Sequence, residues 1–152
     1  MRTKVLIVIL LFGVFVSCTG KKESETAKNR STEIIARFEN GNMKTVKVFE
    51  EIDGKQIWVS EVHYHPNGSK SMEGTIKNGL REGEWISWYE DGKIWSKGNF
   101  KNGNRDGMGY VYFPSGKIQI EGPYIDGKRT GLWRSYDDQG NLISDTDYIS
   151  TK

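Results

Sequence analysis

The only two histidines of the chain, His63 and His65, stand two residues apart. In a strand this spacing would place both imidazoles on one face, with Glu61 as the nearest carboxylate on that face. Zinc sites need three or four protein ligands, and no third histidine or free cysteine completes the set. We therefore expect no metal and no cofactor, and interpret the pair as a solvated strand end before the turn Pro66-Asn67-Gly68.

Two further patterns bear on catalysis. The stretch from Gly122 to Lys128 mimics the start of a phosphate-binding loop. However, Arg129 stands where a serine or threonine should hold magnesium, and no helix pattern follows. No serine or cysteine nucleophile motif appears, and two histidines make the usual general base scarce. We expect that the protein is not an enzyme and has no catalytic residues.

The N-terminal residues 1–17 are predicted to be a signal peptide. Arg2 and Lys4 form a charged start, and the 12 residues from Val5 to Val16 are apolar. As a helix this run would span about 18 Å, which is short of a bilayer core of roughly 30 Å. A cleaved signal is therefore favoured over a membrane-spanning anchor.

The single cysteine lies where the apolar run ends. Phe15-Val16-Ser17-Cys18 resembles a bacterial lipobox, with Phe15 in place of the usual leucine. This resemblance implies that Cys18 is lipidated and that the lipid anchors the chain in the cell envelope. We expect the anchoring membrane to be the bacterial outer membrane. The alternative is an ordinary signal peptide with an incidental cysteine. The polar residues 18–33 are predicted to be a flexible tether.

The charge balance gives no support for nucleic-acid binding. The chain has 22 basic and 20 acidic residues, and Arg2 and Lys4 belong to the predicted signal. The mature chain is therefore formally neutral, with charges of both signs interspersed.

A 24-residue repeat runs through the C-terminal two thirds of the chain. Four columns of glycine keep this step and take 13 of the 18 glycines. The columns are Gly68, Gly92, Gly116 and Gly140; Gly74, Gly98 and Gly122; Gly79, Gly103 and Gly127; and Gly83, Gly107 and Gly131. An aromatic column keeps the same step and consists of Tyr64, Trp88, Tyr112 and Tyr136. Such periodicity is typical of one small unit stacked on copies of itself, and we expect the aromatic column to form its core.

Each repeat is predicted to be a β-hairpin. Apolar and polar residues alternate from Lys93 to Phe100, a second strand covers Met108 to Phe113, and Asn102-Gly103 joins them as a two-residue turn. With this turn Gly98 would face Gly107, and Gly74 would face Gly83, so that either backbone or a large ring could pack closely there. The predicted fold is all-β, an elongated antiparallel meander of hairpins. Residues 34–63 form a degenerate capping repeat, and residues 64–152 form about three full repeats and one half repeat.

The segment Gly98 to Tyr112, repeated as Gly74 to Trp88 and as Gly122 to Tyr136, resembles the MORN-repeat variant, often labelled the YwqK-type antitoxin repeat. This resemblance implies an elongated sheet of hairpins with a binding or scaffolding role and no catalytic residues. Because an exported lipoprotein does not meet a cytoplasmic toxin, the implied role here is immunity against an exported toxin or assembly of a complex.

Two sets of residues are candidates for the binding surface. Trp85, Trp95 and Trp133 are either exposed rings or part of the core. The second set is a column of arginines that keeps the 24-residue step. In stacked repeats these arginines would form a basic edge; the alternative is that their charges only keep the hairpin tips solvated. This set consists of Arg81, Arg105 and Arg129. We expect a protein partner, with the membrane contacted through the lipid; the alternative is glycan or peptidoglycan binding by the tryptophans. The oligomeric state is left open.

Overall fold

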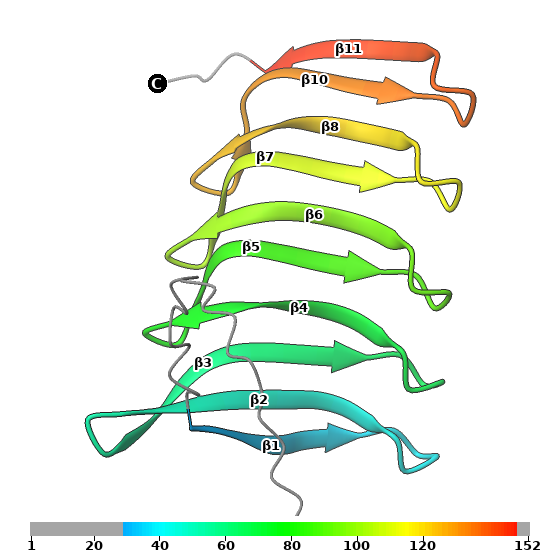
Figure 1. Cartoon of the computed structure of the whole chain (residues 1–152). Coiled ribbons are helices and arrows are strands. Elements are labelled where there is room, and N and C mark those ends of the chain that lie inside the picture. Colours follow the sequence, from blue (N-terminus) through cyan, green and yellow to red (C-terminus); the bar gives the residue numbers. More distant parts are fainter. Residues whose placement is uncertain (1–28, 149–152) are drawn as a thin grey trace, which may run out of the picture.

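A computed structural model describes residues 29–148 as a single antiparallel sheet of eleven strands (Figure 1). The strands are β1 (Arg30–Arg37), β2 (Met43–Ile52), β3 (Lys55–Tyr64), β4 (Lys70–Lys77), β5 (Leu80–Trp88), β6 (Ile94–Lys101), β7 (Asn104–Tyr112), β8 (Ile118–Ile125), β9 (Lys128–Arg129), β10 (Gly131–Tyr136) and β11 (Leu142–Tyr148). Each strand pairs with the next along the chain, except that β8 pairs with both β9 and β10. The predicted all-β meander of hairpins is confirmed.

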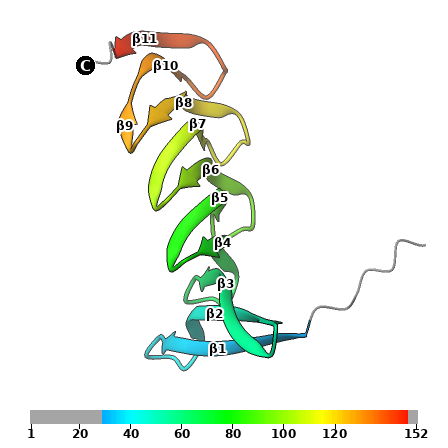
Figure 2. The ribbon, with the colours of Figure 1, turned by 90° about the vertical axis from the view of Figure 1, so that its left-hand side faces the viewer.

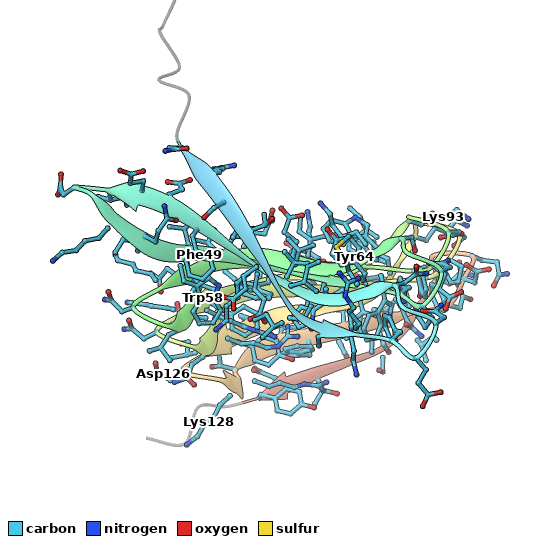
Figure 3. The ribbon with its side chains drawn as sticks, turned by 90° about the horizontal axis from the view of Figure 1, so that it is seen from below. Phe49, Trp58, Tyr64, Lys93, Asp126 and Lys128 are labelled. Carbon is cyan, nitrogen blue, oxygen red and sulfur yellow. The ribbon has the colours of Figure 1, made fainter. Side chains whose placement is uncertain are left out.

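The hairpin turns form where the sequence predicts them. Both central residues of a type I′ turn need positive φ, which asparagine, aspartate and glycine tolerate. Asn102 and Gly103 have φ of 49° and 86°, and the pairs at 78–79, 126–127 and 53–54 are also positive at both positions. Figure 3 looks along the stack and places Asp126 and Lys128 at one end of the strands, with Lys93 at the opposite end.

The predicted pairing of glycines within the hairpins is wrong. Gly98 pairs with Gly109, and Gly74 pairs with Trp85. The cause is a β-bulge that inserts two extra residues into the second strand of each hairpin. The bulge in β5 contains Gly83 (φ 68°), and the bulge in β7 contains Gly107 (φ 97°). Each bulge shifts the register of its hairpin. As a result, Gly83 and Gly107 pair with aromatic residues of the following strand, Phe100 and Tyr124.

The sheet is a single layer along its whole length (Figure 2). Among the described residues no large side chain is less than 2% exposed. The buried apolar side chains are Val46, Val62, Ile76, Trp85 and Trp133. The expected aromatic core column, at positions 64, 88, 112 and 136, is only half-buried. Stability therefore comes from contacts along each face, between one strand and its neighbours, and not from a core between two layers.

Turns of neighbouring repeats are hydrogen bonded to each other. At one end of the strands, the N–H of Gly103 donates to the carbonyl of Arg81 (2.9 Å), and the N–H of Gly127 donates to the carbonyl of Arg105 (2.8 Å). At the other end, the hydroxyl of Tyr89 donates to the carbonyl of Tyr112 (2.7 Å). These bonds hold successive hairpins in a fixed step, as the nearest-neighbour contacts of a repeat array do.

The N-terminal unit consists of β1, β2 and β3. β1 begins at Arg30, so residues 30–33 of the expected tether belong to a strand, paired with β2. The predicted signal peptide, Cys18 and the rest of the tether up to residue 28 lie outside the described residues. No helix occurs among residues 29–148, and so none that is long and apolar enough to cross a membrane.

Candidate functional site

The two faces of the sheet carry different charges from β4 onward. Residues paired across neighbouring strands share a face, so the register sorts the side chains. One face, here called the arginine face, carries Arg81, Arg105 and Arg129 with the rings of Trp85, Phe100, Tyr124, Trp133 and Tyr148. The other, here called the carboxylate face, carries Glu73, Glu82, Glu84, Glu121, Asp145 and Asp147 with Lys97 and Arg134. None of the paired residues on the arginine face from β4 to β11 is an aspartate or glutamate.

Each arginine of the arginine face lies against two rings. The guanidinium carbon of Arg81 is 4.0 Å from the ring centroid of Trp85 and 5.4 Å from that of Phe100. Arg105 lies 5.3 Å from both Phe100 and Tyr124. The result is an alternation of guanidinium and ring along the stack, and each contact is of the cation–π type.

The last arginine continues this alternation. Arg129 lies 4.2 Å from the ring centroid of Trp133 and 5.7 Å from that of Tyr148, and its Nη1 donates to the Tyr148 hydroxyl (3.2 Å). That hydrogen bond is the main cause that raises the pKa of Arg129. Arg129 is exposed, whereas Arg81 and Arg105 are half-buried.

Trp85 and Trp133 have a structural role in the sheet. A nearly buried indole that lies on a glycine of the preceding strand is here called a rung. The two tryptophans are only 3% and 6% exposed, which corrects their proposed use as surface stacking platforms. Each indole lies on a glycine of the preceding strand: a Cβ on Gly74 would come within 2.2 Å of Trp85, and one on Gly122 within 2.3 Å of Trp133. Each indole N–H also donates a hydrogen bond to the carbonyl of the residue that follows the covered glycine, Thr75 for Trp85 (3.1 Å) and Pro123 for Trp133 (3.0 Å). A large ring therefore packs on Gly74, as expected, and on Gly122, but the same expectation is wrong for Gly98, which Arg105 covers, and for Gly83 and Gly107.

Trp95 differs from the other two tryptophans because 48% of its surface is exposed. Its ring lies 6.5 Å from the ring of Tyr89, at the turn end of the strands. Of the three tryptophans considered as sugar platforms, Trp95 alone is accessible, so they do not form an exposed ladder.

The middle repeat lacks the indole rung. Gly109 occupies the position equivalent to Trp85 and Trp133. The ring of Tyr124 covers Gly109, at 2.9 Å from where a Cβ would be, and the guanidinium of Arg105 covers Gly98, at 3.2 Å. A hollow of about 20 Å³, roughly the space of one water, remains between Arg81 and Arg105.

The guanidinium groups of Arg81 and Arg105 have no carboxylate partner. Within residues 29–148 neither makes a side-chain hydrogen bond or an ion pair. The pKa of Arg81 is lowered, mainly by burial; Glu61 opposes this shift, and the positive charge of Arg105 adds to it. Two like charges therefore lie close together on a face that supplies them no counter-charge from β4 onward.

A larger hollow lies on the carboxylate side of the N-terminal half. It has a volume of about 550 Å³, and Glu50, Glu73 and Glu82 are among its lining residues. These carboxylates already have partners. Arg30 donates to Glu50 twice (2.9 Å and 2.7 Å), Lys70 contacts Glu73, and Glu82 accepts the N–H of Asn102 (2.9 Å). The hollow is therefore held in shape by internal ion pairs and hydrogen bonds.

The two histidines have separate partners. His63 Nε2 is 2.7 Å from Glu61 Oε1, whereas His65 Nε2 is 2.9 Å from the carbonyl oxygen of Trp88. Between residues 29 and 148, no group of three or more histidine, cysteine, aspartate or glutamate side chains is arranged to hold a metal ion. His63 Nδ1 also lies 3.3 Å from Thr45 Oγ1 of β2, so His63 links two strands and His65 links a turn to the end of β5.

The sequence reasoning did not include Phe100, Tyr124 and Tyr148 in the candidate surface. These three rings keep the 24-residue step and lie between the arginines. The signal was present, because a column of aromatics runs in register with the column of arginines.

Comparison with known proteins relates part of the chain to a repeat family. No curated protein matches the chain. Three segments match the MORN repeat variant. They cover residues 81–102, 105–126 and 129–149, so each matched segment begins at one of the three arginines of the arginine face. The MORN repeat variant thus accounts for the hairpins from β5 to β11, and this part of the chain is a repeat module.

Proposed function

We propose that the protein is a lipid-anchored, non-catalytic module of the cell envelope that binds a protein partner through its arginine face. The observation that carries this proposal is the row of guanidinium groups beside aromatic rings, on a face whose paired residues from β4 to β11 include no carboxylate. Arginine and aromatic side chains are enriched among the residues that dominate protein interfaces. On this face Arg129 is exposed, and Arg81, Arg105, Phe100 and Tyr124 are half-buried.

The arrangement favours recognition over catalysis. Catalytic groups converge on one reacting atom, with a nucleophile, a base and charge-stabilising donors within hydrogen-bond reach of each other. Here the same arginine and ring recur once per repeat along an extended sheet. Such a surface offers the same contact several times to an elongated partner, and three weak contacts in a row give a useful affinity.

The sequence supports the anchoring. A lipobox-like Phe15-Val16-Ser17-Cys18 follows an apolar run that is short for a membrane span. The polar residues between Cys18 and β1 would hold the sheet away from the lipid surface. A partner in the envelope then fits either an immunity role or a scaffolding role.

A protein partner is favoured over a glycan. Sugar binding by aromatic stacking needs exposed rings, and Trp85 and Trp133 are buried. The guanidinium groups remain as recognition elements, and their planar N–H donors suit carboxylates.

The anchoring is tested by metabolic labelling with an alkyne analogue of palmitate. The wild-type chain should take up label and fractionate with membranes, whereas Cys18→Ser should do neither. Equal labelling of both chains, or release of the wild type into the soluble fraction, would contradict the lipid anchor.

The partner is tested by quantitative capture after cross-linking in native membranes. We compare the wild type with Arg81→Gln/Arg105→Gln and with Lys77→Gln/Lys101→Gln, which removes the same charge from exposed strand ends. A protein retained by the wild type and the lysine variant, and lost from the arginine variant, supports the proposal. If the captured proteins are the same for all three chains, the arginine face is not the binding surface.

A further inference from the structure

The guanidinium groups of the arginine face are oriented by the rings beside them. Each guanidinium carbon lies within 5.7 Å of the centroids of two rings, and these contacts restrict where its N–H donors can lie. Arg81 and Arg105 use none of these donors within the described chain. Each therefore has N–H donors available for the two oxygens of a carboxylate.

The backbone of each arginine is also fixed. The carbonyls of Arg81 and Arg105 accept hydrogen bonds from Gly103 and Gly127, the turn glycines of the following repeats. The side chains begin next to these held turns and end against Phe100 and Tyr124. Little side-chain entropy is then lost when an anion binds, which favours affinity.

The spacing of the arginines selects the shape of the ligand. Arg81, Arg105 and Arg129 lie on β5, β7 and β9, so one strand separates each arginine from the next. Neighbouring strands are about 4.8 Å apart, so the step between arginines is about 9.6 Å. A polyproline II helix presents every third residue on one side, at about 9.3 Å, whereas a β-strand presents every second residue at about 6.7 Å.

The rings between the arginines fit the same ligand. Phe100 lies between Arg81 and Arg105, and Tyr124 lies between Arg105 and Arg129. Aromatic-lined surfaces are the usual docking sites for proline-rich segments in the polyproline II conformation. An acidic residue at every third position would then meet a guanidinium, and the prolines between would contact a ring.

We infer that the arginine face binds an acidic, proline-containing segment of a partner protein, which crosses the strands as a polyproline II helix with one carboxylate per repeat. This inference rests on the proposed function and names the chemistry of the partner. Arg81 and Arg105 are the central binding residues, because both are half-buried and unpaired, and the small hollow lies between them.

The test is fluorescence anisotropy with the full lipidated chain in neutral detergent micelles. The probe is a labelled peptide of four Glu-Pro-Pro units, and the controls are four Gln-Pro-Pro units and a peptide of the same composition with its four glutamates consecutive. We expect the first peptide to bind at least about tenfold more tightly than either control, because each charge-assisted hydrogen bond contributes that much. Equal binding of the two acidic peptides would overturn the predicted spacing.

The residues are tested with the same peptide. Arg81→Gln and Arg105→Gln should each weaken binding about tenfold, while Lys77→Gln/Lys101→Gln should change it less than about twofold. Circular dichroism of each variant checks that the sheet is retained. Vesicles of anionic lipid that bind more tightly than the peptide, with the same arginine dependence, would overturn the inference in favour of a membrane surface.

Failure of the inference differs from failure of the proposed function. If the arginine-dependent protein is captured from membranes but the Glu-Pro-Pro peptide does not bind, the partner has another chemistry and the inference alone falls. If the peptide binds but no membrane protein depends on the arginines, the face is a peptide site and the envelope role falls.

Discussion

The middle repeat and its two neighbours share a backbone but differ at one rung. In the neighbours, Trp85 and Trp133 lie flat on Gly74 and Gly122 and are nearly buried. In the middle repeat Gly109 replaces the indole. Tyr124 and Arg105 then close over the empty positions, and the strands keep the same pairing register.

This difference separates two roles within one repeat. The indoles stabilise the sheet, since both are nearly buried and each packs on a glycine of the preceding strand. The arginines do not depend on the indoles, because Arg105 keeps its place between Phe100 and Tyr124 with no indole beside it. Changes to the rungs should therefore alter stability, and changes to the arginines should alter binding.

The largest effect on stability is expected from removing a rung. Trp133→Ala should lower the free energy of unfolding by about 4 kcal/mol, because a nearly buried indole is lost and Gly122 is uncovered. Trp95→Ala, at a position 48% exposed, should cost less than about 1 kcal/mol. Urea unfolding followed by far-UV circular dichroism measures both. Equal losses would mean that the rung is not what stabilises the neighbouring repeats.

A smaller effect is expected from adding one methyl group beneath a rung. Gly122→Ala would place its Cβ 2.3 Å from the indole of Trp133, so the ring must move, at a cost of about 3 kcal/mol. The matched change Gly98→Ala meets the flexible end of Arg105 at 3.2 Å and should change the free energy of unfolding by less than about 0.5 kcal/mol. A similar cost at both positions in urea unfolding would refute the distinction between the repeats.

The sequence predicts the hairpins well because their signals are local. Asn102-Gly103 fixes a two-residue turn by itself, since both residues adopt positive φ. The period-two alternation then assigns the two faces, and the charged positions Glu73, Lys97, Glu121 and Asp145 do share one face. These features need no knowledge of the neighbouring repeat.

The burial of Trp85 could not be predicted in the same way. Its position depends on the bulge at Gly83, which moves Trp85 opposite Gly74. A bulge changes neither the turn signal nor the alternation of the first strand. A register counted from the turn alone therefore gives no sign of the bulge. One clue existed: the glycine column at 74, 98 and 122 is constant while the column of Trp85, Gly109 and Trp133 is not.

The hairpin turns should not distinguish the repeats. Asn102→Ala and Asn78→Ala each place an alanine at positive φ, 49° and 53°, and each should lower the free energy of unfolding by about 1 kcal/mol. The two costs, measured by urea unfolding, should agree within about 0.5 kcal/mol. A much larger cost at Asn102 would mean that the middle repeat differs in its turn as well as in its rung.

The smallest effect is expected at the opposite turn of the last repeat. Asp137 occupies the position that Phe113 takes in the middle repeat. Its carboxylate accepts hydrogen bonds from the Asn141 side chain (2.9 Å) and from the backbone N–H groups of Asn141 and Gln139 (2.8 Å and 3.0 Å). These bonds lower the pKa of Asp137, with the Asn141 side chain as the main cause.

A lowered pKa in the folded state stabilises the fold only while the carboxylate is charged. The contribution of Asp137 is therefore present above the ordinary aspartate pKa of about 3.9 and is lost as pH falls through its lower folded value. Urea midpoints from pH 5 to pH 2 should fall less steeply for Asp137→Asn than for the wild type. Parallel curves for the two chains would show that this turn contributes no pH dependence.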